Sequence, residues 1–161
     1  MAELTARRGR LILDGGGISA IADGNGVARA ALERARREGW LVVIPAPVLT
    51  EVHTGRSDHA RIDLVINAVD MLIETTPERA RRAGELRSRS GVLDVVDAIV
   101  VAEAVAAPPA LIMTSDPDDI RALIEAAGAA NRVRVIPVRH QRYTSPRPPG
   151  AAEHERRAVR P

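Results

Sequence analysis

The chain has 161 residues, 45% of them hydrophobic and 27% charged, which is close to the average of globular domains and excludes a wholly disordered protein. No apolar run approaches the ~20 residues that a helix needs to cross a bilayer, and no apolar signal-peptide segment follows the arginine-rich start. The chain has no cysteine, which excludes disulfides and thiolate metal ligands. These limits leave a cytoplasmic enzyme or binding domain with no membrane partner.

Charge is divided unevenly along the chain. All 23 basic residues are arginine, and the formal net charge is +2. Residues 139–161 hold six arginines and two glutamates, a balance of +4, whereas residues 1–138 hold seventeen arginines against nineteen carboxylates, a balance of −2. The segment 139–161 also lacks apolar periodicity. We therefore expect one folded, mildly acidic domain over residues 1–138, followed by a disordered basic tail.

Short apolar runs alternate with amphipathic stretches along the folded part. The runs are continuous rather than alternating, which is typical of strands that are covered on both faces in a parallel sheet. The predicted strands are Leu11–Asp14, Leu41–Pro45, Met71–Thr75, Ala110–Ser115 and Val133–Val138. The predicted helices are Asn25–Glu38, Pro47–Thr54, Ser57–Val69, Pro77–Ser90, Val95–Ala107 and Asp118–Ala127. This order predicts an α/β three-layer sandwich around a mostly parallel sheet of about five strands, with the almost wholly apolar Val95–Ala107 at its centre.

Acidic residues stand where such sheets bind their ligands, beyond the carboxyl ends of the strands. Asp14 closes the first predicted strand, and Asp116 follows the fourth. Glu51 lies on the short helix after the second strand, and Asp97 lies in the first turn of the apolar helix. Carboxylates gathered at one edge repel one another unless a cation or retained protons neutralise them. Because the candidate ligands are all oxygens, the pattern favours Mg²⁺ or Mn²⁺, which suits phosphodiester hydrolysis.

Several of these acids also have a purely structural interpretation. Asp94 and Asp97 fit a helix-opening pair, with Asp94 as the N-cap. Asp118 and Asp119 lie near the positive end of the last predicted helix, where acids are favourable. Asp14 ends a buried strand where no helix is predicted to need a cap, so its charge is the hardest to explain structurally.

Other kinds of site find less support. The segment Gly15–Ala20 matches a loose dinucleotide-binding pattern, but Asp14 would face the pyrophosphate, and Pro45 stands where the ribose needs an acid. The four histidines show no ligand spacing, and a phospho-acceptor receiver domain needs a lysine that this chain lacks. Trp40 and Tyr143 are the only aromatic residues, so a nucleic acid would have to be recognised through its backbone and shape.

Four segments of the chain resemble the PIN-domain ribonucleases, and specifically the VapC-like toxins of bacterial toxin–antitoxin pairs. The segments read LILD, PAPVLTEV, LDVVDAIVVAEA and IMTSDPDDIRAL, and the resemblance extends from Leu11 to about Val138. It identifies residues 1–138 as a PIN-like nuclease domain with a PIN-like fold.

The resemblance implies a metal-dependent endoribonuclease that hydrolyses RNA with Mg²⁺ or Mn²⁺ as cofactor. It also implies a homodimer and a small antitoxin protein as partner. The family's acidic positions fall on Asp14, Glu51, Asp97 and Asp116. Of these, Asp14, Asp97 and Asp116 would bind the metal, and Glu51 would complete the catalytic site. Asp94, Asp119 and Thr114 would be auxiliary.

One position departs from the family pattern. Many relatives carry a hydroxyl residue directly after the first acid, whereas this chain has Gly15 in a run of three glycines. Either the backbone takes over that role, or Ser19 or Thr114 substitutes, or the site is weaker than usual. Two other functions stay open on the sequence alone: a housekeeping RNA-processing PIN nuclease, and a non-catalytic α/β binding module whose acids are helix caps.

Overall fold

The computed structural model describes residues 8–53 and 59–139 and contains one five-stranded sheet in the order β3-β2-β1-β4-β5. Every neighbouring pair of strands is parallel. The strands are β1 (Arg10–Leu13), β2 (Leu41–Pro45), β3 (Met71–Ile73), β4 (Ala110–Thr114) and β5 (Val133–Pro137). The predicted five-stranded parallel sheet is therefore confirmed, with β1 at its centre.

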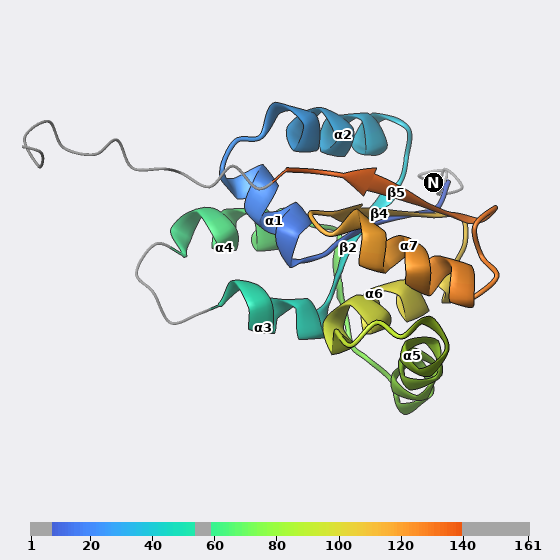
Figure 1. Ribbon diagram of the computed structural model, residues 1–161. Coiled ribbons are helices and arrows are strands. Elements are labelled where there is room, and N and C mark those ends of the chain that lie inside the picture. Colours follow the sequence, from blue (N-terminus) through green and yellow to red (C-terminus); the bar gives the residue numbers. More distant parts are fainter. Residues whose placement is uncertain (1–7, 54–58, 140–161) are drawn as a thin grey trace, which may run out of the picture.

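Helices cover both faces of this sheet and give three layers (Figure 1). The helices are α1 (Gly15–Ala22), α2 (Gly26–Arg37), the 3-10 turn η1 (Ala46–Val48), α3 (Leu49–Val52), α4 (Ala60–Asn67), α5 (Pro77–Ser90), α6 (Val95–Ala106) and α7 (Pro117–Ala126). In Figure 1, α2 lies above the sheet and α5, α6 and α7 lie below it. Helices α1, α3 and α4 gather near the ends at which the strands finish.

The apolar strands and α6 form the core. Leu11, Ile12 and Leu13 of β1 are fully buried, and so are residues 42–44 of β2 and residues 112–113 of β4. Residues 97–104 of α6 are buried as well, and α6 contacts β1, β2 and β4. A helix that is apolar on all sides has to be covered on all sides, which is why α6 occupies the centre of its layer. None of the described helices has the length and apolarity needed to cross a membrane.

Helix α1 is the one element that the sequence pattern did not predict. It begins with Gly15, Gly16 and Gly17, and glycine disfavours a helix interior by about 1 kcal/mol per residue relative to alanine. The fold overrides this preference because the helix starts directly against β4. A Cβ at residue 17 would stand 2.5 Å from the carbonyl oxygen of Met113, so only glycine lets the two backbones approach this closely.

Other predicted elements are confirmed with shorter or shifted bounds. The helix predicted over 47–54 is divided into η1 and α3 and ends at Val52. The helix predicted over 57–69 is α4, which begins at Ala60; residues 54–58 lie outside the described chain. The predicted disordered tail also lies outside it, apart from Arg139.

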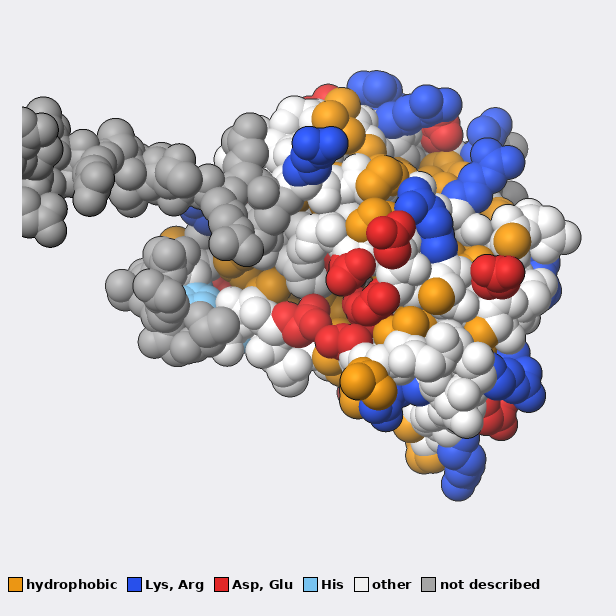
Figure 2. Space-filling view, in the orientation of Figure 1, with side chains coloured by type: hydrophobic (Ala, Val, Ile, Leu, Met, Phe, Trp, Pro, Cys, Tyr) orange, Lys and Arg blue, Asp and Glu red, His pale blue; other side chains and the backbone are white. Residues whose placement is uncertain are grey.

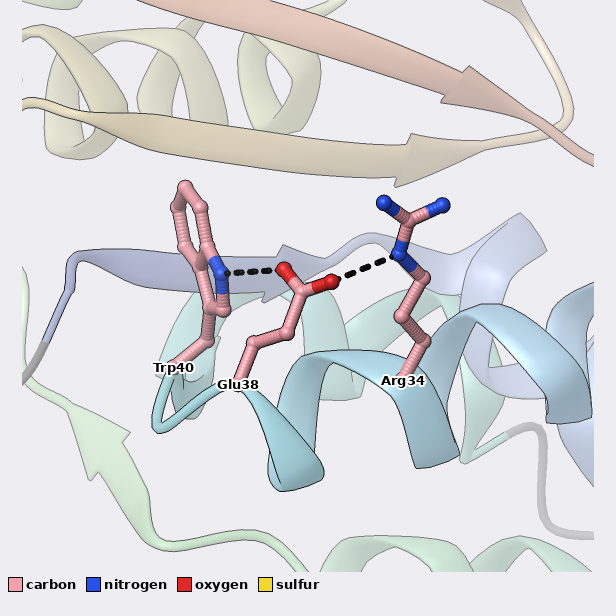
Figure 3. Close-up of polar contacts among 3 residues, drawn as sticks. All are labelled: Arg34, Glu38 and Trp40. Carbon is pink, nitrogen blue, oxygen red and sulfur yellow. Dashed lines mark hydrogen bonds and ion pairs between the residues drawn. The ribbon is translucent and has the colours of Figure 1, made fainter.

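The amino ends of the strands carry a polar cluster around the indole of Trp40 (Figure 3). The Trp40 indole N–H donates a hydrogen bond of 3.3 Å to the Glu38 carboxylate. The same carboxylate accepts a hydrogen bond of 2.7 Å from the Arg34 guanidinium. Trp40 precedes β2, so the one aromatic ring of Phe, Tyr or Trp type within the described residues lies at the opposite edge of the sheet from the predicted acids.

Candidate functional site

The predicted site residues converge on the edge of the sheet formed by the carboxyl ends of the strands. Asp14 follows β1, and its backbone N–H donates to the carbonyl of Met113, near the end of β4. Asp116 follows β4, Glu51 lies in α3, and Asp97 lies in the first turn of α6. Figure 2 shows acidic side chains gathered into one patch on this part of the surface. Parallel strands bring their carboxyl ends to one edge, as the sequence analysis assumed.

Asp14 is the most deeply placed of these carboxylates, with 4% of its surface exposed. Its side chain caps α1 by accepting a 2.6 Å hydrogen bond from the backbone N–H of Gly17. The expectation that Asp14 has no capping role is therefore wrong, because it depended on missing α1. The pKa of Asp14 is raised to about 6, mainly by burial. Hydrogen bonds from Thr114, Gly17 and Gly16 act to lower this pKa, and the charge of Asp116 acts to raise it.

Thr114 connects two of the acids from a fully buried position. Its hydroxyl donates to the Asp14 carboxylate and accepts a 2.9 Å hydrogen bond from the backbone N–H of Asp116. Because the hydroxyl has a partner on each side, it fixes the chain as it turns from β4 into α7. Thr114 thereby fixes the position of Asp14 relative to Asp116.

Asp97 lies at the start of α6, with 9% of its surface exposed. Asp94 caps this helix, since its carboxylate accepts a 2.9 Å hydrogen bond from the Asp97 backbone N–H. The pKa of the Asp97 carboxyl is raised to about 7, first by burial and then by repulsion from Asp94, Asp14, Glu51 and Asp116, in that order. The helix-opening pair predicted for Asp94 and Asp97 is confirmed, and both carboxylates also belong to the acidic cluster.

Glu51 is exposed to solvent on α3 but leans against the start of α1. The backbone N–H of Gly15 donates a hydrogen bond to the Glu51 carboxylate. A Cβ at residue 15 would overlap that carboxylate, so a larger residue there would displace the Glu51 side chain from this position. Partial burial raises the pKa of Glu51, as do the charges of Asp94 and then Asp14.

The structure therefore brings together five of the predicted acids: Asp14, Glu51, Asp94, Asp97 and Asp116. Asp119 lies in the first turn of α7 and does not contribute to the raised pKa values at the site. The sequence analysis noted the glycine run but missed its structural role, which is to bring α1 against Glu51, Ser115 and Met113 at three successive positions.

The donor set has the chemistry of a hard-cation site but is not already closed around an ion. Among residues 8–53 and 59–139, no three acidic or histidine side chains stand close enough together to hold a metal ion as they are placed. Negative groups that share partial burial repel one another and raise one another's pKa values, which a divalent cation would reverse. The ligand atoms are carboxylate oxygens, which fit Mg²⁺ or Mn²⁺ in kind.

A second buried carboxylate, Glu103, lies further along α6 and was not singled out from the sequence. It is 3% exposed, and its Oε2 lies 3.5 Å from the Nε of Arg79 on α5. Burial raises its pKa, while the charge of Arg79 and a hydrogen bond from it act in the opposite direction. This pair joins α5 to α6 and does not belong to the acidic cluster.

Comparison with solved structures identifies the fold. No protein-family model matches the sequence, and no curated protein matches it. A chain from a toxin–antitoxin complex of Klebsiella pneumoniae is 21% identical with a TM-score of 0.58, and the match covers 80% of this chain and 98% of that chain. A chain from VapBC2 of Rickettsia felis, bound to a DNA fragment from their promoter, is 16% identical with a TM-score of 0.52 over 77% of this chain and 96% of that chain.

These likenesses show the fold. The chain has an α/β, PIN-like fold with a five-stranded parallel sheet, and the resemblance predicted from its motifs is confirmed at the level of structure.

Proposed function

We propose that this chain, whose PIN-like fold matches chains of toxin–antitoxin complexes, is a metal-dependent endoribonuclease that acts as the toxin of such a pair. The observation that carries the proposal is the meeting of four acids from different parts of the chain, Asp14, Glu51, Asp97 and Asp116, at one edge of the sheet. Helix capping alone accounts for Asp14 but gives no reason for Glu51 and Asp116 to lie beside it. Raised carboxyl pKa values in such a cluster are typical of functional sites.

Each residue has a role that follows from its position. Asp14, Asp97 and Asp116 would hold Mg²⁺ or Mn²⁺, with Thr114 orienting Asp14. When bound, the ion supplies a water of lowered pKa and charge stabilisation for a phosphate oxygen. Glu51, held by the Gly15 N–H, would orient the attacking water and accept its proton.

The substrate assignment rests on charge and on the aromatic residues. An RNA phosphodiester is the anionic group that a cation among carboxylates would attract. The Trp40 indole lies at the far edge of the sheet and is held by Glu38, so it offers no platform for a base near the acids. Recognition would then depend on the backbone and shape of the RNA.

A protein partner is the second part of the proposal. Both similar structures were solved from toxin–antitoxin pairs, so we expect a small antitoxin encoded beside this chain. A groove of about 510 Å³ between α1, α2 and α4 could receive it, since apolar Ile21, Leu64 and Val69 line it together with Arg29 and Arg61. Leu64 is 70% exposed without such a partner. Co-purification with the product of a short neighbouring reading frame tests this, and light scattering tests the predicted homodimer.

The catalytic proposal is tested by cleavage of an RNA panel with Mg²⁺ and Mn²⁺. Wild-type protein should cleave, and Asp14→Asn and Asp97→Asn should each reduce the rate at least 100-fold. Glu125→Gln, an exposed acid on α7, serves as the control and should keep the wild-type rate. Cleavage that survives in both aspartate variants, or a wild type that cleaves nothing, would contradict the proposal.

A non-catalytic binding module is the competing function, and one observation favours it. Asp14 and Asp94 are both helix caps, so part of the acidic pattern has a structural cause. If the chain is such a module, divalent ions should neither change its thermal stability nor lead to cleavage of RNA. A housekeeping RNA-processing nuclease would behave like the toxin in these assays but would have no antitoxin.

A further inference from the structure

Ser115 has no role in the site as described so far, yet its hydroxyl lies against the first turn of α1, the helix that Asp14 caps. Ser115 follows Thr114 directly and is exposed where Thr114 is fully buried. The Thr114 hydroxyl bonds both Asp14 and the Asp116 N–H, whereas the Ser115 hydroxyl has no hydrogen-bond partner among the described residues. Of these two adjacent hydroxyls, the Ser115 hydroxyl is therefore the one available to hydrogen-bond a ligand.

The glycine run determines where this hydroxyl stands. A Cβ at residue 16 would overlap the Ser115 hydroxyl and lie 2.6 Å from the Ser115 Cβ and 2.8 Å from its backbone nitrogen. Gly16 donates its own N–H to the Asp14 carboxylate. The Ser115 hydroxyl thus lies against Gly16 in the first turn of α1, whose N–H holds the Asp14 carboxylate, and Ser115 is followed by Asp116 in the chain.

We infer that Ser115 supplies the hydroxyl that this chain lacks after its first acid, and that its O–H donates a hydrogen bond to a non-bridging phosphate oxygen of the RNA. This inference rests on the proposed nuclease function. Neutral donors are scarce at the site, because the Gly15 N–H is taken by Glu51 and the Gly16 and Gly17 N–H groups by Asp14. An anionic phosphate beside several carboxylates needs such a donor to orient it.

Ser115→Ala tests the assignment, with Ser19→Ala as the matched control. Ser115→Ala should lower kcat/KM for a cleaved RNA oligonucleotide about tenfold, chiefly through a higher KM, since one hydrogen bond to a charged oxygen is lost. The Tm without ions and the rise in Tm on adding Mn²⁺ should stay at the wild-type values, because Ser115 is exposed and is assigned no metal contact. Ser19→Ala should behave as wild type.

A second variant displaces the same hydroxyl by changing its neighbour on α1. Gly16→Ala places a methyl group where the Ser115 hydroxyl stands and should reproduce the higher KM. Gly84→Ala in α5, where a Cβ meets nothing within 4 Å, should leave kcat and KM unchanged.

The outcomes separate this inference from the proposed function. Wild-type kcat and KM in Ser115→Ala overturn the role of Ser115 while leaving the nuclease intact, and a loss in Ser19→Ala instead moves the hydroxyl to Ser19. A wild type that cleaves no RNA overturns both. A Ser115→Ala protein that loses its Mn²⁺-induced rise in Tm contradicts the phosphate contact and indicates a role in holding the ion.

Discussion

At the scale of single residues, Asp97 shows most clearly the electrostatic cost of gathering several carboxylates in one place. Its carboxyl is buried at a helix start and faces four other acids, and its pKa is raised to about 7. Near neutral pH it is therefore ionised only in part unless a cation is present. Such a residue reduces stability in the empty protein, which is expected of a group kept for function rather than for folding.

Asp97→Asn should therefore raise the Tm of the ion-free protein at pH 8 by a few degrees, because a neutral amide removes both the buried charge and its repulsion. The same variant should lose the Mn²⁺-induced rise in Tm. Thermal unfolding with and without Mn²⁺ measures both effects, with Glu125→Gln as the control. A variant less stable than wild type at pH 8 would mean that Asp97 serves the fold.

Gly15→Ala should be less stable than a variant with an alanine in open space, since its Cβ overlaps the Glu51 carboxylate and lies 3.1 Å from the Glu51 Cβ, so that the Glu51 side chain must shift. Gly26→Ala in α2 provides the comparison, because nothing lies within 4 Å of its Cβ position. Urea denaturation gives the difference between the two variants. Equal stability of the pair would show that the contact between Gly15 and Glu51 is not as close as described.

At the scale of elements, the turn from β4 into α7 holds the site together through one buried hydroxyl. Thr114 has two polar partners, the Asp14 carboxylate and the Asp116 N–H. Replacing Thr114 by valine keeps the shape and removes both hydrogen bonds. The variant should lose about 1–3 kcal/mol of unfolding free energy, which is the penalty of a buried group left without a partner.

Urea denaturation of Thr114→Val checks this expectation. The same variant should also cleave RNA more slowly, since Asp14 and Asp116 lose their common support. Thr50→Val offers a control, because the Thr50 hydroxyl is exposed and bonds only the Pro47 carbonyl. If Thr114→Val were as stable as Thr50→Val, the turn would have to be held by other contacts.

The elements also show how far sequence patterns reach. Continuous apolar runs predicted all five strands, and the apolar pattern of α6 predicted its central place. Helix α1 could not be predicted in this way, because three glycines argue against a helix when read locally. The reason for them lies in partners distant along the chain, Glu51, Ser115 and Met113, and only the fold brings these partners close.

The candidate site, too, could be predicted from the sequence only where it did not depend on contacts between distant residues. Acids after strands predicted which carboxylates would meet, because parallel topology fixes where strands end. The double role of Asp14 as helix cap and cluster member could not be inferred without α1. Nor did the sequence indicate that Ser115 would face α1 while Thr114 faced the interior.

At the scale of the whole molecule, the raised carboxyl pKa values make stability depend on pH. A group whose pKa is higher in the folded state than in the unfolded chain stabilises the fold below its unfolded value, and that contribution is lost as pH rises through the folded value. The contribution of Asp14 is lost between pH 3.8 and about 6, and that of Asp97 is lost between pH 3.8 and about 7. The contribution of Asp14 alone is on the order of 3 kcal/mol.

The ion-free protein should therefore lose stability between about pH 4 and pH 7 relative to an Asp14→Asn, Asp97→Asn double variant. Adding Mn²⁺ should raise the Tm of the wild type more at pH 8 than at pH 5, because protons and the ion compete for the same oxygens. Differential scanning calorimetry across this range makes the measurement. Parallel pH profiles of the wild type and the double variant would contradict it.

The central claim is that carboxylates from three parts of the chain, with Glu51 beside them, share one divalent ion. Crystals soaked in Mn²⁺ test it most directly, through the anomalous difference density. The account predicts a peak in contact with Asp14, Asp97 and Asp116, and no peak there in Asp97→Asn crystals. Wild-type crystals without density among these carboxylates would contradict the account and leave a PIN-like fold with no catalytic centre.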